Sequence, residues 1–214
     1  MITLDRIDRN EAVRYLGNSG VEMNSTMESL MDICEEQILK TAKPKYLYKT
    51  VELENSGLVT GNSITKHLEN CSNAVILCAT LGADIDKIIR TAQITDMAKA
   101  VILDSMSSVA IEQVCNKVEE LIVSENPTLY TTWRFSPGYG DYPIELQSDF
   151  LRLLDAPRKI GLCTNNNSIL APTKSVTAVM GLSENPVDRK RRGCQSCNLA
   201  KTCKFRKAGT HCGF

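Results

Sequence analysis

The longest regular pattern in this sequence of 214 residues runs from Asp96 to about Glu125. Apolar residues recur along it three or four positions apart, which is the spacing of one face of an α-helix. They include Met97, Val101, Met106, Val109, Ala110, Val114, Val118, Leu121 and Ile122. The sequence therefore predicts one long helix with an apolar face.

A second segment, Ala74–Thr80, is a continuous apolar run of strand length between Asn73 and Gly82. Such a run is typical of a strand that is buried on both faces. We expect it to lie in the centre of a sheet. The glycine turn after it is expected to begin another helix, which carries Ile85, Ile88 and Ile89 on one face.

The other segments show shorter helix and strand patterns. Helices are expected at 10–16, 25–43, 63–68 and 144–154, and strands at 46–54, 58–60, 130–135, 160–163, 168–170 and 175–182. Ser25 and Glu28 have the spacing of a capping box that begins the second helix. Together these segments predict an α+β fold, a single domain with a mostly antiparallel, twisted sheet and packed helices.

The composition is that of an ordinary globular protein, with 43% apolar and 23% charged residues. A chain of this length is sufficient for one well-buried domain. No segment approaches the ~20 apolar residues of a membrane-spanning helix, and Met1–Asp5 does not begin a secretion signal. We therefore expect a cytoplasmic protein without a membrane partner.

Nine cysteines in a chain without a secretion signal favour reduced thiols or metal ligands over disulfide bonds. Five are scattered, mostly among apolar neighbours, and are expected to be small core residues: Cys34, Cys71, Cys78, Cys115 and Cys163. The other four lie close together near the end of the chain: Cys194, Cys197, Cys203 and Cys212. We expect a domain of residues 1–187 followed by a cysteine-rich tail of residues 188–214.

The four clustered cysteines predict a metal site, because they offer four soft ligands and begin with a Cys-x-x-Cys pair. Tetrahedral zinc and an iron–sulfur cluster both accept four thiolates, and the spacing does not decide between them. A metal would supply the folding free energy of a tail with only three large apolar residues, Leu199, Phe205 and Phe214. The alternative is a redox-labile, disordered tail.

The charge of the chain is zero overall but unevenly distributed. Residues 188–214 hold eight of the 25 Lys and Arg residues and one of the 25 Asp and Glu residues, so the tail carries +7 and residues 1–187 carry −7. A basic tail favours nucleic acid or an acidic partner surface, and a zinc knuckle that binds nucleic acid is one interpretation. The other is that these charges solubilise the tail and offset metal-bound thiolates.

The segment from Thr132 to Pro143 contains the only tryptophan of the chain, two tyrosines and two prolines. Arg134 presents a planar set of donors that suits a carboxylate or a phosphate. Gly138 allows a ligand to approach the backbone closely, and the prolines restrict the loop. The segment therefore predicts a rigid loop that binds a small anionic ligand. A simple turn, with Arg134 in a surface ion pair, is the alternative interpretation.

Three stretches carry a resemblance to one family. Arg134–Tyr139, with the pattern Arg-x-x-x-Gly-Tyr, resembles a signature of the activation domain of cobalamin-dependent methionine synthase, which binds S-adenosylmethionine. Leu170–Ser183 is similar to the second signature of that family, and Asn10–Gly17 resembles the start of its free-standing members. The three stretches lie in the family's order and span most of residues 1–183.

The resemblance implies which residues bind the ligand. Arg134 would pair with the carboxylate of S-adenosylmethionine, while Ser136, Gly138 and Tyr139 would line the loop. Ala110–Gln113 resembles the family helix whose glutamate contacts the ligand. Glu112 would then bind the amino group of the ligand or balance its positive charge. No nucleophile or general base is expected, because cobalt attacks the methyl carbon.

Two features depart from the family pattern. Val176 and Thr177 stand where fused methionine synthases carry a pair of tyrosines, and the sequence does not decide whether Asp5 or Asp8 corresponds to an N-terminal acidic ligand. The contacts of those family residues are therefore not carried over to this chain.

The resemblance also implies a function in methionine biosynthesis. In the family, the domain supports reductive methylation of oxidised cob(II)alamin, with S-adenosylmethionine as the methyl donor and an external electron. Because this chain has no cobalamin, folate or homocysteine module, we expect its partner to be a separate corrinoid-binding methyltransferase, such as a split methionine synthase. A flavodoxin or ferredoxin would donate the electron, and this need favours an iron–sulfur cluster in the tail. The alternative is a module that only binds S-adenosylmethionine or docks on a corrinoid protein.

Overall fold

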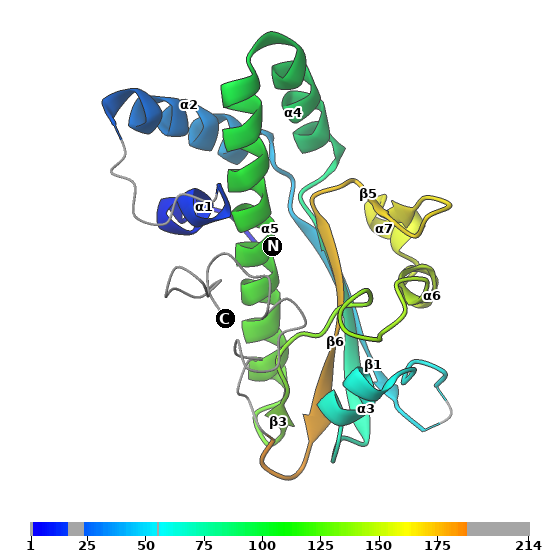
Figure 1. The fold of residues 1–214 in the computed structure, drawn as a ribbon. Helices are drawn as coiled ribbons and strands as arrows, with labels where there is room; N and C mark the ends of the chain where they lie inside the picture. Colours follow the sequence, from blue (N-terminus) through cyan, green and yellow to red (C-terminus); the bar gives the residue numbers. More distant parts are fainter. Residues whose placement is uncertain (1, 17–23, 55, 188–214) are drawn as a thin grey trace.

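The helix expected from Asp96 onward forms as α5 (Met97–Glu125), which lies along one face of a four-stranded sheet (Figure 1). The computed structural model describes residues 2–16, 24–54 and 56–187. The other helices are α1 (Arg9–Tyr15), α2 (Ser25–Thr41), α3 (Asn62–His67), α4 (Ala83–Thr95), α6 (Leu146–Leu154) and α7 (Ala156–Ile160). The strands are β1 (Lys45–Glu52), β2 (Asn73–Thr80), β3 (Tyr130–Thr131), β4 (Cys163–Thr164), β5 (Leu170–Ala171) and β6 (Ser175–Ser183).

The main sheet has the strand order β1-β2-β6-β3, and each neighbouring pair is antiparallel. Strands β4 and β5 form a separate antiparallel pair. The expected α+β fold with a mostly antiparallel sheet is therefore confirmed. The apolar run that begins at Ala74 forms a buried strand between β1 and β6, as its composition predicted.

Helices cover both faces of the sheet, and β2 contributes to a hydrophobic core on each side. Val75, Leu77 and Ala79 pack with α1, α2, α4 and α5. The alternate residues of the strand pack with α3, α6, α7 and the segment around Phe135 and Tyr142. Figure 1 shows these two helical layers on opposite sides of the strands.

The predicted N-cap of α2, Ser25, is wrong by one residue. Asn24 is the N-cap, and its side-chain oxygen accepts a hydrogen bond from the backbone N–H of Met27 at 2.9 Å. Ser25 is instead the first helical residue. Asn and Ser cap helices about equally well. The sequence therefore did not decide between Asn24 and Ser25 as the N-cap.

Three predicted strands differ from the observed ones. Residues 58–60 do not form a strand, because β1 pairs with β2 and the Leu58 carbonyl accepts the Tyr142 hydroxyl. The strand expected at 160–163 overlaps a helix, because Ala156–Ile160 forms α7, which has Pro157 in its first turn. Strand β3 ends early because the Gly181 N–H donates to the Thr132 hydroxyl oxygen at 2.8 Å and not to the Thr132 carbonyl, although the Thr132 N–H donates to the Gly181 carbonyl and an isolated bridge follows at Phe135.

Candidate functional site

A cluster of polar side chains joins α5 to the predicted ligand loop. Glu112, Asn116 and Glu119 lie four and three residues apart, and therefore on one face of α5. Arg134 reaches all three. Its Nη1 donates to Glu119 Oε2 at 2.7 Å, and its Nη2 donates to Asn116 Oδ1 at 2.8 Å and to Glu112 Oε2 at 3.2 Å.

The members of this cluster differ in their exposure to solvent. The side chain of Arg134 is only 12% exposed and that of Glu119 is 20% exposed, whereas Glu112 is 47% exposed. The most accessible charge is therefore the Glu112 carboxylate. The alternative interpretation of Arg134 as an ion-pair residue is correct in part, because the ion pairs exist but Arg134 is largely covered.

The loop that carries Arg134 is attached to α3 through Asp141. The Asp141 carboxylate accepts the backbone N–H groups of Asn62 and Ser63 at 2.7 and 2.8 Å, and these bonds lower its pKa. Gly61 precedes them with φ of 108°, and a Cβ at this position would lie 2.6 Å from the Asp141 carbonyl oxygen. Only glycine combines this backbone conformation with so close an approach.

Two further contacts hold the ends of the loop. The buried Tyr142 hydroxyl donates to the Leu58 carbonyl at 2.9 Å. His67 Nε2 lies 2.9 Å from both the Thr132 hydroxyl and the Trp133 carbonyl, so that α3 contacts the beginning of the loop as well as its end. The loop is thus fixed from one side of the sheet while Arg134 reaches α5 on the other.

The middle of the loop is a tight turn that uses its own backbone donors. Gly138 N–H donates to the Tyr142 carbonyl at 2.8 Å, and Tyr139 N–H donates to the Ser136 carbonyl at 3.3 Å. Gly138 has φ of 93°, which favours glycine. Since both amides are used within the turn, Gly138 and Tyr139 offer a ligand their exposed surfaces and not these backbone donors. Ser136 is half-buried.

Two tyrosines flank Glu112. Tyr139 is 64% exposed and Tyr15, at the end of α1, is 51% exposed. Burial, and next the Glu112 carboxylate, raise the pKa of both phenols. Both tyrosines are therefore neutral at pH 7 and present aromatic surface beside a carboxylate. Such surface suits the apolar and cationic parts of a small ligand.

The structure thus brings together the predicted residues Glu112, Arg134 and Tyr139, with Ser136 and Gly138 in the turn between the last two. Sequence reasoning missed Asn116, Glu119 and Tyr15. Asn116 and Glu119 could have been found from their spacing to Glu112, because residues four and three positions apart lie on one face of the long helix. Nothing local marked Tyr15, because its place depends on how α1 packs against α5.

The connection before β6, which belongs to the second signature, contacts α4 and α5. Lys174 Nζ is 2.8 Å from Asp104 Oδ1 and 2.9 Å from Ser108 Oγ, both on α5. Thr173 is held by Asp86 of α4 through bonds of 2.9 and 2.6 Å. This connection therefore joins β6 to α4 and to α5, the helix that also carries Glu112, Asn116 and Glu119.

The residues that depart from the family pattern have structural contacts. Val176 packs against the core on the α5 side, and the buried Thr177 hydroxyl donates to Gln147 Oε1 at 2.9 Å. Asp8 caps α1 by accepting the Glu11 N–H at 3.1 Å, whereas the Asp5 side chain is 83% exposed and lies 4.0 Å from Lys117. Asp5 is therefore the acid that is more accessible to a ligand.

Four of the five cysteines that were expected to be core residues are buried or partly buried. Cys34, Cys78 and Cys115 are buried and Cys71 is partly buried, but Cys163 is exposed on β4. Burial raises the pKa of the Cys115 thiol, close to Arg134, to about 12, so this thiol is neutral. Cys194, Cys197, Cys203 and Cys212 lie outside the described residues. Within the described part, no group of three or more His, Cys, Asp or Glu residues is arranged to hold a metal ion.

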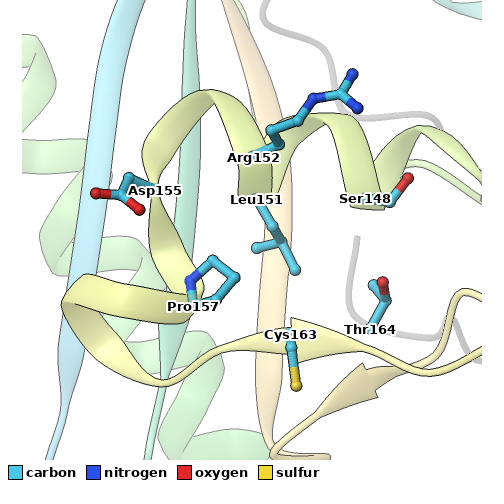
Figure 2. Close-up of a pocket in the computed structure, with 7 residues that line it drawn as sticks. All are labelled: Ser148, Leu151, Arg152, Asp155, Pro157, Cys163 and Thr164. Atoms are coloured by element: carbon cyan, nitrogen blue, oxygen red, sulfur yellow. The ribbon is translucent and has the colours of Figure 1, made fainter.

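A surface hollow of about 310 Å³ lies elsewhere, on the side of the sheet that α6 and α7 cover (Figure 2). Its lining consists of Ser148, Leu151, Arg152, Asp155, Pro157, Cys163 and Thr164. None of the predicted site residues lines it. No helix in the described ranges is long and apolar enough to cross a membrane.

Comparison with known proteins gives a result at the level of structure. No protein-family model matches the chain, and no curated protein matches its sequence. A solved structure described as the MetH reactivation domain bound to AdoHcy aligns with 96% of this chain and 82% of that chain. The TM-score is 0.59 at 12% sequence identity. The resemblance expected from the two signatures is thus confirmed at the level of the fold: this chain has the fold of the MetH reactivation domain.

Proposed function

We propose that this protein binds S-adenosylmethionine at the surface formed by Glu112, Arg134 and Tyr139. The observation that carries the proposal is the convergence of Glu112 and Arg134 at 3.2 Å. They come from segments far apart in the chain, in a fold shared with a domain that was solved with AdoHcy bound. AdoHcy, S-adenosylhomocysteine, is the product that S-adenosylmethionine leaves after it gives up its methyl group.

The chemistry of this surface suits an α-amino acid head group. Such a group carries an ammonium and a carboxylate on one carbon, and Glu112 and Arg134 offer one partner of each sign. Binding would exchange the protein's ion pair for two pairs with the ligand, while Glu119 continues to hold Arg134 at 2.7 Å. The exposed Tyr139 would supply an aromatic wall beside the head group.

We further propose that the bound donor serves reductive methylation of cob(II)alamin held by a separate corrinoid-binding methyltransferase. One external electron reduces Co(II) to Co(I), which takes the methyl group from the sulfonium and releases S-adenosylhomocysteine. The contribution of this chain would be to hold the donor in position. The described surface needs no nucleophile for that task.

The tail belongs to the same proposal. Residues 188–214 would form a metal-binding segment in which Cys194, Cys197, Cys203 and Cys212 hold an iron–sulfur cluster or zinc, as their number and spacing suggest. A cluster would relay the electron from a flavodoxin or ferredoxin. Anaerobic purification followed by an absorption spectrum and analysis of iron, sulfide and zinc distinguishes the two metals. Zinc alone would leave electron transfer to another protein.

A reconstituted reaction tests the function. The protein is mixed with a cob(II)alamin-loaded corrinoid methyltransferase, a reductant and S-adenosylmethionine that carries an isotopic label in its methyl group. The expected result is labelled methylcobalamin that depends on the protein. Binding of S-adenosylmethionine without methylation would reduce the function to that of a ligand-binding or docking module. Absence of binding would refute the site as well.

A further inference from the structure

We infer that Glu119 sets the ligand charge that this site prefers. It gives the Glu112–Arg134–Glu119 cluster a net negative charge, so that the site binds the cationic methyl donor more tightly than the neutral product. The inference rests on the proposed function, since it requires S-adenosylmethionine at this surface. Glu119 acts as a positioning residue that holds Arg134 and balances its charge.

The charge count follows from the ion pairs around the cluster. Lys174 pairs with Asp104 at 2.8 Å, Arg14 pairs with Glu11, and Lys117 lies 4.0 Å from Asp5. Each of these neighbouring pairs is balanced. The cluster itself contains two carboxylates, Glu112 and Glu119, and one guanidinium. Among the described residues, the second carboxylate therefore leaves the site with one negative charge in excess.

Geometry assigns this role to Glu119 and not to Glu112. Glu119 has the shorter bond to Arg134, 2.7 Å against 3.2 Å, and its side chain is 20% exposed against 47% for Glu112. Nη2 of Arg134 donates to both Asn116 and Glu112, and this sharing weakens its hydrogen bond to the Glu112 carboxylate. Glu119 thus serves as the lasting counter-ion of Arg134, and Glu112 stays accessible to a cationic group.

The two ligands of the proposed reaction differ by one charge. S-Adenosylmethionine has an ammonium, a sulfonium and a carboxylate, with a net charge of about +1 at neutral pH. S-Adenosylhomocysteine has the same adenosine and the same head group but a neutral thioether. A protein charge several ångströms away in a partly exposed site changes the affinity for a cation by about threefold to tenfold. Transfer of the methyl group would therefore weaken binding and favour release of the product.

Calorimetric titration of matched variants tests the inference. Wild-type protein, Glu119→Gln and Glu120→Gln are each titrated with S-adenosylmethionine, S-adenosylhomocysteine and methylthioadenosine, which lacks the amino acid group. In Glu119→Gln, the preference for S-adenosylmethionine over S-adenosylhomocysteine should fall about threefold to tenfold, while the affinity for methylthioadenosine stays unchanged. Glu120→Gln is the control, because the exposed Glu120 lies next to Glu119 without a bond to Arg134.

Each other outcome has a defined meaning. An unchanged preference for S-adenosylmethionine in Glu119→Gln overturns the inference. An equal loss of affinity for all three ligands also overturns it, because it indicates that Glu119 has only a structural role. If the variant does not fold, the wild-type preference is measured at about 0.05 M and about 0.5 M salt, and a preference that salt leaves unchanged is contrary to the inference. If wild-type protein binds neither adenosyl ligand, the proposed function itself fails.

Discussion

Arg134 is the residue through which the loop contacts α5, and it makes three side-chain hydrogen bonds to that helix. Its fork-shaped donor group allows it to bind a carboxylate of a ligand while one edge remains paired with Glu119. Lysine presents a point charge and cannot use two edges in this way. The side chain is therefore expected to be sensitive even to a conservative change.

We predict that Arg134→Ala lowers the affinity for S-adenosylhomocysteine by at least about tenfold, because a charge-assisted bidentate pair is worth about 1.5–3 kcal/mol. Arg134→Lys should restore only part of this loss. Calorimetry gives the affinities, and circular dichroism verifies that each variant is folded. Arg152→Ala is the control, because this arginine is 82% exposed and forms its ion pair with Asp149 on α6. Equal affinities of wild-type protein and Arg134→Ala would refute the assigned site.

At the scale of residues, the sequence pointed to Arg134 and Tyr139 through a motif and to Glu112 through a resemblance. It did not reveal which carboxylates of the chain would pair with Arg134. That arrangement depends on the distance between the loop and α5, which no local spacing specifies. For the same reason Glu119 was missed, although it makes the shorter of the two ion pairs.

Helix α3 depends on a residue that is distant in the sequence. Its N-cap is Gly61, which has no side chain to accept a backbone N–H, and Asp141 supplies the missing acceptor from 79 residues away in sequence. The helix has six residues and would be marginal alone. Its first turn is thus formed together with the ligand loop.

We predict that Asp141→Ala lowers the melting temperature at pH 7. Backbone and side-chain hydrogen bonds lower the pKa of Asp141 in the folded state, so its stabilising effect is present above the ordinary pKa of about 3.9 and is lost as the pH falls through the folded-state pKa. The difference between wild type and variant should therefore shrink as the pH falls below about 4. Thermal unfolding at several pH values measures it, with Glu145→Ala as the control at an exposed carboxylate that does not cap its helix, α6. A difference that is independent of pH would contradict this account.

At the scale of elements, the helices and strands with periodic patterns were predicted well, and so were the short helices α1 and α3, but β4, β5 and α7 were not. Helix α5 and strand β2 were found because many residues support each pattern. Strands β4 and β5 have two residues each, and α7 has five. Their conformations depend on packing against α6 and β6, which a local sequence window does not contain.

The sheet forms one structural unit with the two helical layers, because β2 places adjacent side chains in different cores. Ile76 lies in the core with α3, α6 and α7, and Leu77 lies in the core with α1, α2, α4 and α5. Both side chains are fully buried. The two layers should therefore unfold together.

We predict that Ile76→Ala and Leu77→Ala each lower the free energy of unfolding by about 2–5 kcal/mol. In both variants a single cooperative transition should remain. Urea denaturation followed by far-ultraviolet circular dichroism and by the fluorescence of Trp133 tests this, because the tryptophan packs with the α3 and α6 core. Two separated transitions in either variant would mean that the layers are independent.

At the scale of the whole molecule, the fold class followed from the sequence, but the strand order did not. The central pair joins residues 73–80 with residues 175–183, and nothing in either strand specifies the other as its partner. The family resemblance did not supply this order either, whereas the fold as a whole matches the solved MetH domain at a TM-score of 0.59.

Because Asp141 caps α3, a movement of the loop that carries Asp141 affects the hydrogen exchange of two amides in that helix. When the ligand loop swings away, the backbone amides of Asn62 and Ser63 lose their acceptor and exchange their hydrogens with solvent. The exchange rate of these two amides therefore reports how often the loop opens, although neither residue belongs to the proposed binding surface. A ligand that holds the loop closed should slow exchange at Asn62 and Ser63, so that occupancy of one side of the sheet becomes measurable as amide protection on the other.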